Sequence, residues 1–175
     1  MANTIKELVG QIQNEAVDSN SDLGSLLRKC KLLAAQLGSK PLEDWLIWES
    51  AGYPDDVDVP KYRIWTLQLK GEFHGIGGRG YSNVPIPSIA VPEKDRLGYQ
   101  EYNYRQSISG IQTALKDSKD DRFSVATGDL SVAIGTNLYE GFNCIKVWAE
   151  IPKGYLIEVI NKDGVLSMSL AYTET

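Results

Sequence analysis

The N-terminal part of the chain repeats apolar residues with the period of an α-helix. Between residues 4 and 17 they recur at every third or fourth position, and Asn3 is placed to cap the helix. A second stripe persists for about four turns, after which Gly38 suits the position just past a helix end. The second stripe consists of Leu23, Leu26, Leu27, Cys30, Leu33, Ala34 and Leu37. These patterns predict two amphipathic helices that pack through their apolar faces.

A third helix is predicted from Pro41 to Gly52. Proline is favoured at the first position of a helix and glycine just after its last turn. The apolar residues of this segment cover more than one face, which indicates a helix packed between other elements. Trp45 and Trp48 are therefore interpreted as core side chains rather than as ligand-stacking ones.

From Arg63 onward, the spacing of the apolar residues changes from the helical period to alternation. Every second residue after it is apolar, which is typical of a half-buried strand, and Gly71 within the alternation predicts a bulge. The glycine-rich segment 75–80 ends this strand. The proline-rich segment 82–92 is expected to form an ordered coil, and residues 143–151 are expected to form a second strand.

Short helices are predicted at 108–117 and 128–137, and a charged, solvated loop at 116–122. The last segment, 154–173, fits two different structures. A turn at 161–164 would make it a hairpin, whereas the spacing of its apolar residues also fits a helix.

Together these elements predict an α+β fold, in which an N-terminal unit of about three helices packs with a small, largely antiparallel sheet and further short helices. Residues 1–175 are expected to be a single domain, because no linker or repeat divides them. A hydrophobic content of 42% is sufficient for a packed core. No apolar run approaches the roughly 20 residues that cross a bilayer, and the first residues do not resemble a signal peptide. We therefore expect a cytoplasmic protein without a membrane partner.

The formal net charge of -5 disfavours a general nucleic-acid binder, which normally presents a basic face. Long duplex DNA is therefore not expected as a partner. A local basic pocket for a small anion remains compatible with this charge.

Cysteine and histidine usage limits the chemistry that the chain can perform. Cys30 and Cys144 are isolated, flanked by apolar residues and without CxxC spacing, so we expect buried, reduced thiols. His74 is the only histidine; it lies at a glycine-rich break, where functional residues occur, but no nucleophile motif accompanies it. We therefore assign no catalytic residue, metal ligand or cofactor, favour a non-enzymatic role, and keep His74 as a candidate ligand-binding residue.

Two further features could bind an anion. The glycines of 75–80 could form a nest of backbone N–H groups with Arg79 supplying charge, although a turn that needs positive φ angles is the simpler interpretation. An aromatic–basic cluster consists of Tyr99, Tyr102 and Tyr104 with Arg96 and Arg105, and such residues can stack on a base and pair with a phosphate. The cluster suits a nucleotide and a protein partner equally well. A shared pocket would require Arg79 and Arg105 on one surface.

Carboxylates near residues 43–58 leave an enzymatic alternative open. Together with Lys70 facing Glu72, they would suit a metal-dependent nuclease. Turn and surface roles also explain most of them. The carboxylates are Glu43, Asp44, Glu49, Asp55, Asp56 and Asp58.

Residues 26–65 resemble the N-terminal signature of the AbiTii family. They contain a helix of the type LxxAxxLAxxLG, followed by LxxWxxxE, GYPD and PxYR. The matching positions are Leu32, Leu33, Ala34, Leu37, Gly38, Leu42, Trp45, Glu49, Gly52, Tyr53, Pro54, Asp55, Pro60, Tyr62 and Arg63. The segments NVPIP (83–87) and VWAEIP (147–152) also look like family landmarks. The motif residues expected to have structural roles are Trp45, Gly52, Tyr53, Pro54, Asp55, Tyr62 and Arg63.

This resemblance implies a part in bacterial abortive infection, a defence against phage. AbiTii domains often stand at an N-terminus, before an effector-like region. The resemblance thus favours a sensor or regulatory module that binds an infection-linked ligand, such as a nucleotide-derived signal, and controls an effector in cis or in a partner protein. It implies a helix for the last segment and provides no catalytic residue to transfer. The alternatives are the nuclease-type effector and a purely structural oligomerisation domain, and a homo-oligomer is compatible with each.

Overall fold

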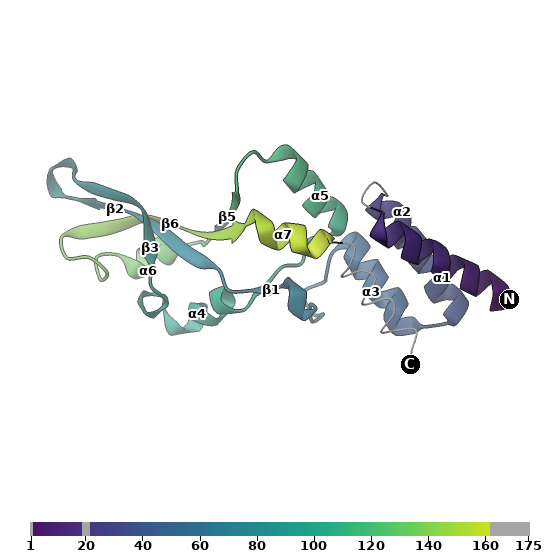
Figure 1. Ribbon diagram of the computed structural model, residues 1–175. Coiled ribbons are helices and arrows are strands. Elements are labelled where there is room, and N and C mark those ends of the chain that lie inside the picture. The colour runs from purple at the N-terminus through teal and green to yellow at the C-terminus, as the bar shows by residue number, and fades with distance from the viewer. Residues whose placement is uncertain (1, 19–21, 162–175) are drawn as a thin grey trace. The chain divides into compact units, whose positions relative to one another are not determined.

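The computed structural model describes residues 2–18 and 22–161 and has the predicted α+β architecture (Figure 1). The helices are α1 (Ala2–Val17), α2 (Leu23–Leu37), α3 (Lys40–Ala51), α4 (Glu93–Gln100), α5 (Ile108–Asp117), α6 (Leu130–Ile134) and α7 (Lys153–Ile160). The strands are β1 (Ile64–Trp65), β2 (Gln68–Gly75), β3 (Gly80–Ile86), β4 (Tyr102–Asn103), β5 (Arg122–Ala126) and β6 (Phe142–Pro152). Helices α1 to α3 precede the strands in the chain, as expected.

The chain divides into two compact units. The first, here called the helical unit, comprises the described residues of 2–58, Arg105–Ser118 and 156–161. The second, here called the sheet unit, comprises Val59–Tyr104 and Lys119–Tyr155. Helices α1, α2, α3 and α5 therefore belong to the helical unit, and the strands named above belong to the sheet unit.

Helix α2 provides much of the core of the helical unit. The Asp22 carboxylate caps its start by accepting a hydrogen bond from the Ser25 N–H at 2.8 Å. Gly38, with a φ of 65°, ends it as predicted. Its buried side chains are Leu23, Leu26, Leu27, Cys30, Leu33 and Ala34. Leu37, which the sequence also places on the stripe, is instead 40% exposed, because it lies in the last turn next to the helix end.

Helices α1 and α3 add to this core, together with Ile108 of α5. Helix α1 begins at Ala2, so Asn3 lies inside it rather than capping it, contrary to the prediction. The two helices contribute Ile12, Ala16, Leu42, Trp45 and Leu46. Cys30 is a free, buried cysteine, as predicted; burial and the nearby Glu15 carboxylate raise the pKa of its thiol to about 11. This thiol is therefore protonated and unreactive at neutral pH.

The sheet unit is built on a four-stranded antiparallel sheet with the strand order β3-β2-β6-β5. Strands β2, β3 and β6 run beside one another in Figure 1. The register of β2 shifts between Gly71 and Phe73, next to the glycine at which the sequence predicts a bulge. A short pair, β1 with β4, lies in the same unit.

Two parts of this unit differ from the sequence predictions. The prediction of a coil at 82–92 is wrong at its start, because Gly80–Ile86 forms strand β3. Prolines are tolerated there because β3 is an edge strand, one side of which has no ladder hydrogen bonds to lose. The sequence patterns also miss helix α4, and they miss strand β5, which begins at the end of the predicted charged loop.

The short helices are largely as expected. In α5 the Ser107 hydroxyl accepts a hydrogen bond from the Gly110 N–H at 3.1 Å and so caps the helix. Helix α7 confirms the helical interpretation for the first part of 154–173; the part from residue 162 onward lies outside the described residues. In the described ranges, no helix is both long and apolar enough to cross a bilayer.

The alternation of side chains gives the four-stranded sheet two different faces. On one face lie the buried residues Leu69, Phe73, Ile86, Ala149 and Ile151. On the other face, β2 and β6 place Lys70, Glu72, Lys146, Trp148 and Glu150. This second face, here called the polar face, carries a tryptophan among charged side chains.

Candidate ligand-binding site

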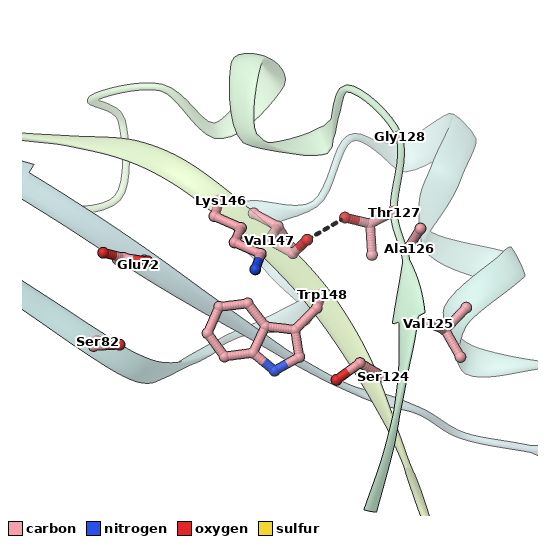
Figure 2. Close-up of a pocket in the computed structure, with 10 residues that line it drawn as sticks. All are labelled: Glu72, Ser82, Ser124, Val125, Ala126, Thr127, Gly128, Lys146, Val147 and Trp148. Atoms are coloured by element: carbon pink, nitrogen blue, oxygen red, sulfur yellow. Dashed lines mark hydrogen bonds between the residues drawn. The ribbon is translucent and has the colours of Figure 1, made fainter.

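A hollow of about 660 Å³ lies on the polar face of the sheet (Figure 2). Its lining residues are Glu72, Ser82, Ser124, Val125, Ala126, Thr127, Gly128, Lys146, Val147 and Trp148. They come from β2, β3, β5 and β6 and from the loop that follows β5. Its volume falls within the range of about 300–1,000 Å³ that is typical of small-molecule sites. We call this feature the Trp148 hollow.

The strand register explains why these side chains meet. Trp148 lies directly opposite Lys70, and Lys146 lies directly opposite Glu72, on neighbouring antiparallel strands. The Trp148 indole is half-buried and reaches into the hollow, and the Lys146 amino group lies 5.7 Å from the centre of the Trp148 ring (Figure 2). The hollow therefore combines an aromatic surface with a cationic group.

A buried carboxylate holds the Trp148 ring in place. The indole N–H donates a hydrogen bond to Glu150 Oε1 at 3.2 Å. Glu150 Oε2 lies 3.1 Å from Lys70 Nζ and 3.3 Å from Arg122 Nη1, and its side chain is only 10% exposed. Because one edge of the indole is fixed by this network, the ring is oriented before any ligand arrives.

The same network sets the charge of Glu150. Burial alone would raise the pKa of this carboxyl, but hydrogen bonds from Trp148 and Lys70 and the charges of Lys70 and Arg122 outweigh burial, so the pKa lies below its usual value. Glu150 is therefore ionised at neutral pH. An ionised Glu150 keeps both cations on this face of the sheet.

The rim of the hollow is also ordered by hydrogen bonds. His74 Nε2 lies 3.0 Å from Glu72 Oε1, which holds the Glu72 carboxylate at the rim. The Thr127 hydroxyl donates to the Val147 carbonyl at 2.8 Å and ties the loop after β5 to β6 (Figure 2). His74, one of the ligand-binding candidates predicted from the sequence, thus contacts the lining of this hollow.

Arg105 lies in the helical unit and is bonded to the turn that follows α3. Its Nη1 donates to the Val57 carbonyl at 2.7 Å and to the Pro54 carbonyl, and its Nε lies 3.8 Å from the Asp55 carboxylate. Its own carbonyl accepts a hydrogen bond from the Tyr53 N–H at 2.8 Å. These bonds brace the turn through Nη1 of the guanidinium, and a phosphate-binding role of Arg105 stays a prediction.

Arg105→Ala is expected to lower the free energy of unfolding by about 1–3 kcal/mol, because two backbone carbonyls lose a charged donor. Urea denaturation of the purified protein measures this. Arg79→Ala is the matched control, since Arg79 is exposed on the β2–β3 hairpin and should leave stability unchanged. Unchanged stability of Arg105→Ala combined with weaker nucleotide binding would instead favour the ligand role.

The predicted tyrosine cluster is largely packed into the sheet unit. Tyr104 is buried and stacks on Trp65 with 4.7 Å between ring centres. Tyr102 pairs with Trp65 in the β1–β4 ladder and is partly buried. Burial raises the pKa of both tyrosines. Arg79 belongs to the sheet unit and Arg105 to the helical unit, so the shared pocket for the two arginines stays a prediction.

The family-motif residues take part in local structure. Gly52 ends α3 with a φ of 98°, and a Cβ there would lie 3.0 Å from the Arg105 carbonyl, so glycine is required. The buried Tyr53 hydroxyl donates to the buried Glu49 carboxylate at 2.6 Å. Arg63 is fully buried, and its Nη1 donates to the Tyr104 carbonyl at 3.4 Å.

Several carboxylates of the nuclease alternative have other partners. Glu43 and Asp44 pair with Lys40 along α3. Lys70, expected to face Glu72, forms its ion pair with Glu150 instead, because Glu150 extends beside it from β6. Within the part of the chain that the structure describes, no group of three or more histidine, cysteine or acidic side chains could hold a metal ion.

Sequence reasoning did not single out Trp148 or Lys146. The pattern that could have found them is in the strand predicted at 143–151, where Lys146, Trp148 and Glu150 alternate with apolar residues. A half-exposed tryptophan between two charged residues on one face of a strand is unusual for a core position.

Comparison with known proteins identifies one family. A family model described as AbiTii matches residues 7–170, which is nearly the whole chain. No curated protein and no solved structure matches the chain.

Proposed function

Because the chain belongs to the AbiTii family, which is associated with abortive infection, we propose that it is a non-enzymatic sensor and regulatory module of an antiphage system. The module binds a small infection-linked ligand in the Trp148 hollow. Binding is passed to an effector, either a further region of the same protein or a partner protein. The family provides the setting of abortive infection, and the contacts in the hollow support the sensing role.

One observation carries this proposal: the Trp148 indole is partly exposed, held at its edge, and lines a hollow of suitable size. A fixed aromatic surface binds flat ligands well because little side-chain freedom is lost on binding. Stacking of a base on an aromatic side chain contributes about 1–3 kcal/mol. A tryptophan with a role only in the core would be covered by other side chains and would not line a hollow.

The charges around the ring support a nucleotide-derived ligand. Lys146 lies above the Trp148 ring, where a phosphate of a stacked nucleotide would be within its reach. Lys70 and Arg122 add positive charge on the same face, although Glu150 neutralises part of it. This basic spot on a protein of net charge -5 suits a small anion rather than long duplex DNA.

Trp148→Ala is expected to weaken nucleotide binding by about tenfold or more, because the stacking surface is lost. Isothermal titration calorimetry with ribonucleoside monophosphates and their cyclic dinucleotides measures the affinity of each variant. Trp148→Phe keeps an aromatic face and should recover most of the affinity.

Trp48→Phe is the matched control, since Trp48 lies on α3 in the helical unit and contacts Tyr53, with 5.9 Å between ring centres. It should bind nucleotides as the unchanged protein does. If none of these nucleotides binds, or if Trp148→Ala binds them unchanged, the Trp148 hollow is not a nucleotide site.

A further inference from the structure

The Trp148 hollow contains a carboxylate where the edge of a stacked ring would lie. Glu72 lines the hollow and is the diagonal neighbour of Trp148 on the polar face, since Trp148 pairs with Lys70 and Glu72 pairs with Lys146. Diagonal neighbours on a sheet face are about 7–8 Å apart. A planar ring that covers the indole therefore brings its edge toward Glu72. Figure 2 shows Glu72 beyond the six-membered ring of the indole.

This carboxylate is held in place and still able to accept hydrogen bonds. His74 Nε2 lies 3.0 Å from Oε1 of Glu72, and the Glu72 side chain is 34% exposed. An ionised carboxylate has about four lone-pair positions on its two oxygens and no hydrogen to donate. The contact with His74 takes one of these positions, so both oxygens can still accept from a ligand.

The nucleobases differ in what they offer to such an acceptor. Guanine presents its ring N1–H and its 2-amino group side by side, which matches the two oxygens of a carboxylate. Adenine and cytosine present one amino group beside a ring nitrogen that is itself an acceptor. Uracil presents one N–H between two carbonyl oxygens. Those acceptors would face the negative carboxylate and repel it, so the match distinguishes guanine from the other bases.

We infer that the Trp148 hollow selects a guanine nucleotide and that Glu72 is its specificity-determining residue, an inference that rests on the proposed nucleotide-binding function. The base stacks on Trp148, and its N1–H and 2-amino groups donate to the Glu72 carboxylate. Lys146 and the hydroxyls of Ser82 and Ser124 line the remainder of the hollow and take the phosphate and sugar. His74 is a positioning residue that holds Glu72.

The unchanged protein provides the first test. Guanosine, inosine, adenosine and uridine 5′-monophosphates are titrated into it and their dissociation constants compared by calorimetry. Inosine lacks only the 2-amino group, so it should bind about tenfold more weakly than guanosine, which is the effect of one hydrogen bond to a charged group. Adenosine and uridine should bind more weakly still. This comparison requires no variant, so a folding defect cannot disturb it.

Glu72→Gln provides the second test. An amide offers one donor and one acceptor in place of two acceptors, so guanosine should bind about tenfold more weakly and its advantage over inosine should disappear. Glu93→Gln removes an exposed carboxylate elsewhere in the sheet unit and should leave all four affinities unchanged.

The outcomes separate this inference from the proposed function. Equal affinity for the four nucleotides, together with weaker binding by Trp148→Ala, would overturn guanine selection and leave the nucleotide site intact. A guanine preference that Glu72→Gln retains would overturn the role of Glu72. Absence of binding by all four monophosphates and by the cyclic dinucleotides would overturn both proposals.

Discussion

Leu33→Ala in α2 is expected to lower the free energy of unfolding by about 2–5 kcal/mol, because it removes buried methyl groups and leaves a cavity. Leu33 is 2% exposed and belongs to the core cluster formed by α1, α2, α3 and Ile108 of α5. The residues of this cluster come from four helices, so we expect them to close the gap only in part. Urea denaturation followed by circular dichroism at a helical wavelength measures the loss.

Leu32→Ala is a matched control for this prediction, since the same side chain is removed one position earlier on the same helix. Leu32 is 59% exposed, so its loss should change the free energy of unfolding by less than about 1 kcal/mol. Equal effects of the two substitutions would mean that both faces of α2 are covered, for example in an oligomer. A neutral Leu33→Ala would contradict the core position of the stripe.

The helical core could be predicted from the sequence because its information is local. The stripe of α2 repeats over consecutive turns, and a cap at Asp22 and a left-handed Gly38 fix the two helix ends. The one error in the stripe, Leu37, arises because periodicity does not report where the neighbouring helices stop. The local pattern of apolar residues therefore identified helix α2 and most of its buried side chains.

The sheet was harder to predict because strand positions depend on partners far away in the chain. Prolines at 85 and 87 resemble coil in sequence, and only the place of β3 at the sheet edge makes Pro85 acceptable in a strand. Strand β5 follows a charged loop, and its alternation extends over only five residues. Neither strand can be assigned from its own residues without knowing the strand order.

The candidate site shows the same limit. Tyr102, Tyr104 and Arg105 are neighbours in sequence and so attracted attention, yet Tyr104 packs on Trp65 and Arg105 braces a turn. Glu72 and Lys146 meet only through the pairing of β2 with β6. The alternation in 143–151 could have indicated Lys146 and Trp148, but no local motif could have placed Glu72 beside them, because it comes from a distant strand.

Glu150→Ala is expected to lower the free energy of unfolding at pH 7 by about 3–5 kcal/mol, the effect of breaking a buried ion pair. The substitution leaves Lys70, 15% exposed on its side chain, without its carboxylate partner at 3.1 Å. It also removes the acceptor of the Trp148 indole N–H. Arg122 adds little to the loss, because its side chain is 52% exposed.

The pH dependence of stability tests the same network. The pKa of Glu150 is lowered in the folded protein, so the unfolded chain binds a proton at this carboxyl at a higher pH than the folded one does. The stabilisation is therefore complete above the unfolded pKa and is lost as the pH falls through the folded pKa.

We expect the unchanged protein to lose stability over this acidic range more steeply than Glu150→Gln. Below this range the stabilities of the two proteins should approach each other. Urea midpoints measured at a series of pH values report the difference, with Glu101→Gln, at an exposed position, as the control. Parallel curves for the unchanged protein and Glu150→Gln would contradict a lowered pKa at Glu150. They would also contradict an ionised carboxylate that holds the Trp148 indole.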